Sequence, residues 1–224
     1  RAVMNESPPD SIGIVDTMGC ATPEAIKYMV RWVKEMTGLP IEIHTHNDFG
    51  MGVATELAAV TVGAEVVHSC ANGLGERTGN AAMEELMLGL DLLYGYDTGY
   101  RLDKLPELAD LVSQVSNIPI ARNKPVLGHG NFIRESGIGI QYVMNDPLVM
   151  FGTHPALTGR AGQVVLGKKS GKASIQYKLG ELNVGGVEDH QIGEILGAVK
   201  EKGISKKDIL SDAEFLEIVS SITS

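Results

Sequence analysis

The sequence predicts an α/β protein built on a parallel sheet, and three observations support this fold class. Short apolar strands alternate with helices over the first hundred or so residues, at intervals of roughly thirty residues, which is the pattern of βαβ units. Polar residues follow each strand, as they do at the C-terminal ends of parallel strands in barrels and doubly wound sheets. No Gly-x-Gly-x-x-Gly string or Walker motif follows a strand, so a (β/α)₈ barrel is favoured over a nucleotide-binding fold.

Three βα units are expected in order along the chain. In the first, a strand over 11–16 precedes a helix. Thr22 as N-cap, Pro23 at the first helical position and Glu24 in the first turn predict that this helix begins there, runs to about Met36 and ends at Gly38. The second unit has a strand over 40–45 and a helix over 52–62. The third has a strand over 65–69 and a helix over 79–94.

The rest of the chain has a different pattern. An amphipathic helix is expected over 102–117, an irregular Gly-rich stretch over 118–175, and short helices over 189–202 and 212–222, separated by Gly203 and by Ser205 as an N-cap. We therefore expect two domains: 1–100 as the C-terminal three βα units of a (β/α)₈ barrel, and 101–224 as a small, mostly helical subdomain. Five further units would have to lie upstream of Arg1, in a missing N-terminal half of the barrel.

Composition and charge exclude several function classes. The 224 residues carry a formal net charge of −9 at pH 7, whereas nucleic-acid binding needs a basic face. No apolar run approaches the roughly 18 residues that would span a bilayer, so no membrane role is expected. The two cysteines, Cys20 and Cys70, form neither a disulfide framework nor a zinc-type spacing, which favours a cytoplasmic protein.

A His-x-His pair at the end of the second strand is the sharpest chemical signal. Residues i and i+2 of a strand point to the same face, so His44 and His46 would project together and could bind one divalent cation. Imidazole suits Zn²⁺, Mn²⁺ or Fe²⁺, and an added carboxylate with waters would admit Mg²⁺. The alternative is that one histidine faces solvent and the other packs. Asp48 is expected to orient a ligand rather than to bind the metal itself.

A Gly-rich string follows the third strand. Asn72–Asn80 (NGLGERTGN) contains glycines that permit a tight turn near a ligand, and its last residues open the expected helix, whose N-terminal amides favour anions. The alternative is an ordinary βα turn with a capping Asn.

Four strings together resemble a known family. Asp16-Thr17, HTHNDFG at 44–50, NGLGERTGNA at 72–81 and LGKKSGK at 166–172 are similar, in order, to motifs of the 2-isopropylmalate and homocitrate synthases. These enzymes belong to the DRE-TIM metallolyases, together with the hydroxymethylglutaryl-CoA lyases and 4-hydroxy-2-oxovalerate aldolases. The resemblance covers nearly the whole chain. The Gly-Glu-Arg string favours the synthases, since the lyases have a Gly-Gly-Cys-Pro-like loop there.

The resemblance implies roles for particular residues. His44, His46 and Asn80 would be metal ligands, Thr17 would bind the carboxylate of a 2-oxo acid, and Glu76 would lie near the acyl-CoA pocket. The remaining metal ligand would be an acid in the missing half. The implied activity is that of an acyltransferase in amino-acid biosynthesis: a Claisen condensation of acetyl-CoA with a 2-oxo acid, in a homodimer, with a divalent metal ion (Mg²⁺, Mn²⁺ or Zn²⁺) as cofactor.

The chain departs from the family in the second domain. The family's His-Glu-Ser-Gly-Ile-His-like motif reads Arg134 to Gly139 here, so its second, catalytic histidine is Gly139, and a family tyrosine corresponds to Met150. Glycine cannot transfer a proton. His154 is the candidate catalytic replacement, with His129 as a second possibility, although either could be a solvated loop histidine.

Three functions therefore stay open. The first is a divergent synthase, with Re-face citrate synthase among the possibilities; the second is a catalytically silent metal-binding scaffold subunit; the third is a lyase or aldolase of the same superfamily. The chain alone is expected to be inactive, because three βα units leave both edges of the sheet unpaired.

Overall fold

The structure, a computed structural model, describes residues 2–7 and 9–223, so Arg1, Pro8 and Ser224 lie outside the described residues. It forms two compact units, Arg1–Gly128 and His129–Ser224. The helix that follows residue 101 belongs to the first unit, so these units divide later than the expected boundary between residues 100 and 101. The domain assignment of 1–100 and 101–224 stays a prediction.

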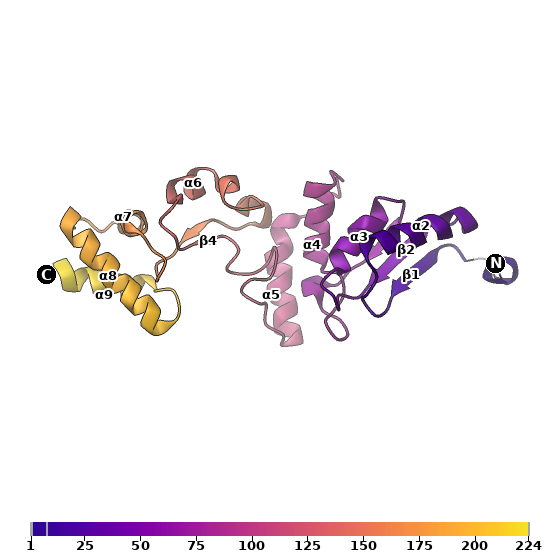
Figure 1. The fold of residues 1–224 in the computed structure, drawn as a ribbon, viewed down its shortest axis with the longest axis horizontal. Helices are drawn as coiled ribbons and strands as arrows, with labels where there is room; N and C mark the ends of the chain where they lie inside the picture. Colours follow the sequence, from indigo (N-terminus) through magenta and orange to yellow (C-terminus); the bar gives the residue numbers. More distant parts are fainter. Residues whose placement is uncertain (1, 8, 224) are drawn as a thin grey trace. The chain divides into compact units, whose positions relative to one another are not determined.

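The first unit contains three strands and five α-helices among its described residues. They are α1 (Ala2–Glu6), β1 (Ile12–Asp16), α2 (Pro23–Thr37), β2 (Ile41–Thr45), α3 (Gly52–Val60), β3 (Val66–His68), α4 (Met83–Leu88) and α5 (Leu105–Ser116), with a short 3₁₀ turn over Ala71–Gly73. The strands form one parallel sheet in the order β1-β2-β3 (Figure 1). The predicted α/β fold class and parallel sheet are confirmed.

One face of this sheet is packed and the other is open. Ile14 of β1 and Ile41 and Ile43 of β2 are buried against Ile26 and Val30 of α2, in a cluster that also includes Ala59 and Ala64. The opposite face carries the alternate residues of each strand. Val15 is 57% exposed there and Val66 is 42% exposed. Strand alternation therefore places Glu42, His44 and His68 on the open face, in register with Val15 and Val66.

In the first unit, the predicted ends of α2 are confirmed, and the predicted start of the third helix is wrong. Thr22 caps α2 by accepting a hydrogen bond from the Ala25 amide, and Gly38 ends it in the left-handed conformation, as predicted. The third helix, expected from residue 79, begins only at Met83. Asn80 and Ala82 are bridged to His46 and Cys70 instead, so this segment is extended and pairs with the strand ends.

The second unit is mostly helical. Its elements are β4 (Ile133–Arg134), α6 (Ile140–Asn145), β5 (Gln163–Val164), α7 (Lys172–Glu181), α8 (Asp189–Lys206) and α9 (Asp212–Thr223). A core that includes Ile175, Ile195 and Phe215 joins α7, α8 and α9. The expected helix stop at Gly203 and the N-cap at Ser205 are wrong, because α8 continues to Lys206. Gly203 is buried, and a Cβ built on it would lie only 2.9 Å from the backbone nitrogen of Lys168 and 3.0 Å from Cα of Gly167.

No helix within the described ranges is long and apolar enough to cross a membrane.

Candidate metal centre

The two histidines of the His-x-His pair lie together at the C-terminal end of β2. Their ring centroids are 5.3 Å apart, with the rings nearly perpendicular. His46 is 9% exposed, and its Nδ1 has no hydrogen-bond partner within the described part of the chain. Burial lowers the pKa of His44, and the neighbouring His46 and His68 lower it further. The neutral imidazole that a metal requires is therefore the favoured form of His44.

Asn80 joins this pair from the loop after β3. Its side-chain Nδ2 lies 3.1 Å from Nε2 of His44 and 3.5 Å from the carbonyl oxygen of Thr45, and the residue is 5% exposed. The structure thus brings together His44, His46 and Asn80, the three residues that the family resemblance implies as metal ligands. An amide oxygen and two imidazoles are all metal-ligand types.

Two further polar residues on the open face were missed by the sequence analysis. Nε2 of His68 lies 3.2 Å from Oε2 of Glu42, and Ser11 donates a 2.6 Å hydrogen bond to Oε1 of the same carboxyl group. The His68 ring is 5.6 Å from that of His44. The signal was available: Glu42 is two residues before His44 in a strand, so alternation places both on one face.

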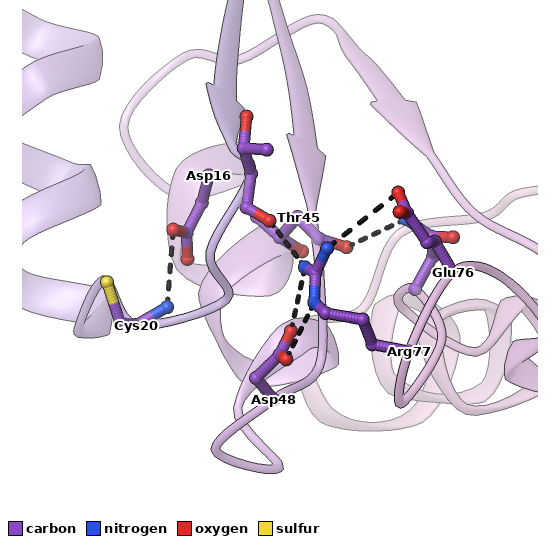
Figure 2. Close-up of polar contacts among 8 residues, drawn as sticks. Asp16, Cys20, Thr45, Asp48, Glu76 and Arg77 are labelled. Atoms are coloured by element: carbon purple, nitrogen blue, oxygen red, sulfur yellow. Dashed lines mark hydrogen bonds and ion pairs between the residues drawn. The ribbon is translucent and has the colours of Figure 1, made fainter.

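Arg77 links the loops that follow all three strands. Its Nε and Nη2 donate to the two carboxylate oxygens of Asp48 at 2.9 and 3.0 Å (Figure 2). Nη2 also donates to the Thr17 carbonyl oxygen at 2.5 Å. The hydrogen bonds from Arg77 lower the pKa of Asp48. Arg77 has a backbone φ of 59°, a left-handed conformation that residues other than glycine rarely adopt. Asp48 is thus held by Arg77, beside the histidine pair.

The remaining candidate residues of the first unit, Thr17 and Glu76, lie beside Arg77. Thr17 is exposed, directly after β1, with its carbonyl oxygen bound to Arg77. The Glu76 side chain is 79% exposed, and one of its carboxylate oxygens is 3.8 Å from Nη1 of Arg77 (Figure 2). Thr17 and Glu76 are therefore at the same end of the sheet as the histidines, at its solvent-exposed rim.

We expect Arg77→Lys to make the loops after β1 and β2 more mobile, with little effect on global stability. Lysine cannot keep the two-pronged contact with Asp48 and the contact with Thr17 at once, and exposed ion pairs contribute only about 0–1 kcal/mol. Hydrogen exchange at residues 17–20 and 46–50 should become faster. Arg101→Lys is the matched control, since Arg101 forms a similar exposed fork with Asp103. Unchanged hydrogen exchange in Arg77→Lys would show that Arg77 does not hold the loops after β1 and β2 together.

The metal chemistry fits these residues but needs more ligands than they supply. Among the described residues, no group of three or more His, Cys, Asp or Glu side chains could hold a metal ion. His44, His46 and Asn80 provide two imidazoles and an amide. The partnerless Nδ1 of His46 and the close approach of Asn80 to His44 are what a shared ligand would account for. A complete site would take its remaining ligands from outside this set.

The second unit holds the remaining candidates. His154 caps a 3₁₀ turn (Pro155–Thr158) by accepting a hydrogen bond at Nδ1 from the Ala156 amide, 3.2 Å away. Gly139 has a φ of 77°, and a Cβ built on it would lie 3.7 Å from Sδ of Met150. The two positions where the family has histidine and tyrosine are thus neighbours. Gly139 also lines an open cavity of about 460 Å³ beside Tyr142 and Tyr177.

Comparison with known proteins gives the class. A family model described as HMGL-like matches residues 2–112. (R)-citramalate synthase CimA of Methanocaldococcus jannaschii is 37% identical over 214 residues, which cover 96% of this chain and 43% of that protein. Homocitrate synthase AksA of Methanopyrus kandleri is 38% identical over 213 residues, 95% of this chain and 53% of that protein. The 2-isopropylmalate synthase of M. jannaschii is 39% identical over 203 residues, 89% of this chain and 39% of that protein.

The chain belongs to the HMGL-like family, as a member of its 2-isopropylmalate/homocitrate synthase group. The predicted fold, the C-terminal part of a (β/α)₈ barrel followed by a small, mostly helical subdomain, is confirmed with it. The chain spans about half the length of the curated relatives it matches.

Proposed function

We propose that this chain supplies the metal-binding strand ends of an enzyme that condenses acetyl-CoA with a 2-oxo acid. The observation that carries the proposal is the convergence of His44, His46 and Asn80 at the end of β2. The relatives are named as synthases of citramalate, homocitrate and isopropylmalate. Their products share one pattern, a 2-hydroxy acid with a carboxymethyl group on the hydroxyl-bearing carbon. An acetyl group added to the carbonyl carbon of a 2-oxo acid gives this pattern, so a 2-oxo acid is the proposed acceptor and acetyl-CoA the proposed donor.

The proposed roles follow from the positions of the residues. His44, His46 and Asn80 hold a divalent cation (Mg²⁺, Mn²⁺ or Zn²⁺), which when bound polarises the carbonyl group of the 2-oxo acid. Thr17, at the exposed rim, donates a hydrogen bond to the acid's carboxylate. Glu76 faces solvent at the same rim, where it can contact the thioester. Asp48, fixed by Arg77, keeps the loop after β2 in place.

The condensation also needs a general acid and a general base. A proton must leave the thioester methyl group before the new carbon–carbon bond forms, and the thioester is then hydrolysed. Gly139 and Met150 stand where the family has histidine and tyrosine. His154 is the proposed replacement, and it reaches the active site of the other subunit in a homodimer. The upstream half of the barrel is a second proposed partner of this chain.

A second candidate is a metal-binding scaffold subunit without catalysis. The left-handed backbone at Gly139 favours it, because a histidine there would be strained, so the loop is adapted to glycine. A lyase or aldolase is a third candidate, and Gly75-Glu76-Arg77 disfavours it.

The deciding assay incubates the natural full-length protein with acetyl-CoA, a divalent cation and a panel of 2-oxo acids. Release of free CoA thiol supports the synthase; its absence with every acid supports the scaffold.

We expect metal binding to depend on both histidines. His44→Ala or His46→Ala should weaken the affinity for Mn²⁺ or Zn²⁺ by about tenfold or more, as the loss of one of few ligands does. Titration calorimetry measures this. His190→Ala, an exposed histidine in α8, is the control. Unchanged metal content in the His44→Ala, His46→Ala double variant would contradict the metal centre.

A further inference from the structure

We propose that Glu56 is a positioning residue that holds the His44–His46 segment in place through Thr45. The inference rests on the proposed metal centre and adds to it a residue from α3, on the far side of the sheet from the histidine rings. Figure 2 shows Thr45 at the C-terminal end of β2.

Glu56 contacts Thr45 twice. Its Oε1 accepts a hydrogen bond from the backbone amide of Thr45 and another from Oγ1 of Thr45, both at 3.1 Å. Oγ1 of Thr45 is also 3.1 Å from the carbonyl oxygen of Gly52, at the start of α3. Both Thr45 and Glu56 are fully buried. The residue between the two histidines is thus tied to α3 by a carboxyl group that water does not reach.

The other backbone contacts of this segment come from the strand ends and loops. The His46 amide donates to the Asp16 carbonyl oxygen at 3.2 Å, and the Asn47 amide donates to that of Gly79 at 2.9 Å. The Thr45 carbonyl oxygen accepts from the Ala81 amide at 3.2 Å. Glu56 provides the matching anchor from the helix layer. Without it, the amide and the hydroxyl group of Thr45 would both lose a buried acceptor, and the strand end would shift in response.

Stability does not explain a carboxyl group at this position. Oε2 of Glu56 is buried and has no hydrogen-bond partner among residues 2–7 and 9–223, and Leu57, Ala58 and Ala59 around it in α3 are apolar and buried. A buried polar group without a partner destabilises a fold. Burial raises the pKa of Glu56 to about 8, so the group is a neutral acid at pH 7, the form that such a site tolerates. What the Glu56 carboxyl group contributes is a fixed position for the amide and the hydroxyl group of Thr45.

The test compares Glu56→Gln with Glu56→Leu in the natural protein. Glutamine keeps an oxygen that can accept from Thr45, so its affinity for Mn²⁺ should stay within about twofold of the original. Leucine fills the space without an acceptor, and should weaken Mn²⁺ binding by about tenfold, the effect of removing a group that orients metal ligands. Circular dichroism and thermal unfolding establish that both variants fold. Equal affinity in Glu56→Leu and Glu56→Gln would overturn the proposal.

A second pair of variants guards against a folding failure at position 56. Thr45→Val removes the hydroxyl and should weaken Mn²⁺ binding, whereas Thr45→Ser keeps it and should not. Histidine ¹H–¹⁵N spectra of the metal-free protein separate this inference from the metal proposal. If His44→Ala leaves metal binding intact but Glu56→Leu still shifts the His44 and His46 resonances, positioning stands and the metal centre fails. Resonances that do not move in Glu56→Leu overturn positioning itself.

Discussion

Gly75→Ala should displace Asn80 and weaken metal binding by about tenfold or more, because Asn80 is one of the few proposed ligands. A Cβ on Gly75 would overlap Oδ1 of Asn80 and lie 2.9 Å from its Cγ. Asn80 has little room to yield, since it is 5% exposed and its Nδ2 contacts His44 and the Thr45 carbonyl oxygen. Overpacking of this kind also destabilises a fold by about 1–3 kcal/mol. Mn²⁺ titration and thermal unfolding measure the two effects.

Gly193→Ala is the matched control for this substitution. Gly193 lies inside α8, and a Cβ there would meet nothing within 4 Å. Alanine is the better helix former, so the control should gain up to about 1 kcal/mol of stability and leave metal binding unchanged. If Gly75→Ala binds Mn²⁺ as the original protein does, Asn80 is not held where the metal proposal requires it.

Stability should fall as pH rises from 5 to 8, and Glu56→Gln should remove much of that fall. The pKa of Glu56 is raised from an ordinary 4.5 to about 8 in the folded state. Below pH 4.5 the group is protonated in both states. Between the two values the unfolded chain releases a proton that the folded chain keeps, so the free energy of unfolding decreases. At 1.36 kcal/mol per pKa unit, the decrease is on the order of 3 kcal/mol.

The control is a glutamate whose pKa is shifted the other way. Hydrogen bonds from Lys206 and Ser211 lower the pKa of Glu214 to about 2, so this group stays ionised from pH 5 to 8. Glu214→Gln should leave the slope over that range unchanged. Denaturant unfolding at half-unit pH steps gives the slopes. The same slope in Glu56→Gln and in the original protein would show that Glu56 ionises normally and is not buried as described.

Local signals in the sequence predicted the elements where the chain itself determines the structure. The Thr22 cap, the Gly38 stop and the alternation in β2 all depend on neighbouring residues, and all three are found. Predictions failed where distant contacts decide. Gly203 is a helix breaker by type, but close packing on Gly167 requires a glycine inside α8. The segment after Gly79 pairs with strand ends instead of starting a helix.

The candidate site was predicted in part for the same reason. His44 and His46 are two residues apart, and strand periodicity alone places them together. Asn80 came from the family resemblance. Glu56 was missed, because nothing local marks it: it lies in an apolar helix, and its role depends on a contact with Thr45 that only the packing of α3 on β2 creates.

The central claim is that His44 and His46 together bind a divalent cation. Electron spin echo spectroscopy of Mn²⁺ bound to the natural protein tests it most directly, because it detects ligand nitrogens through their coupling to the metal. Two imidazole nitrogens should couple, their signals should change when histidine is labelled with ¹⁵N, and both should vanish in the His44→Ala, His46→Ala double variant. Bound Mn²⁺ without nitrogen coupling, or with coupling that survives in the double variant, would contradict the claim.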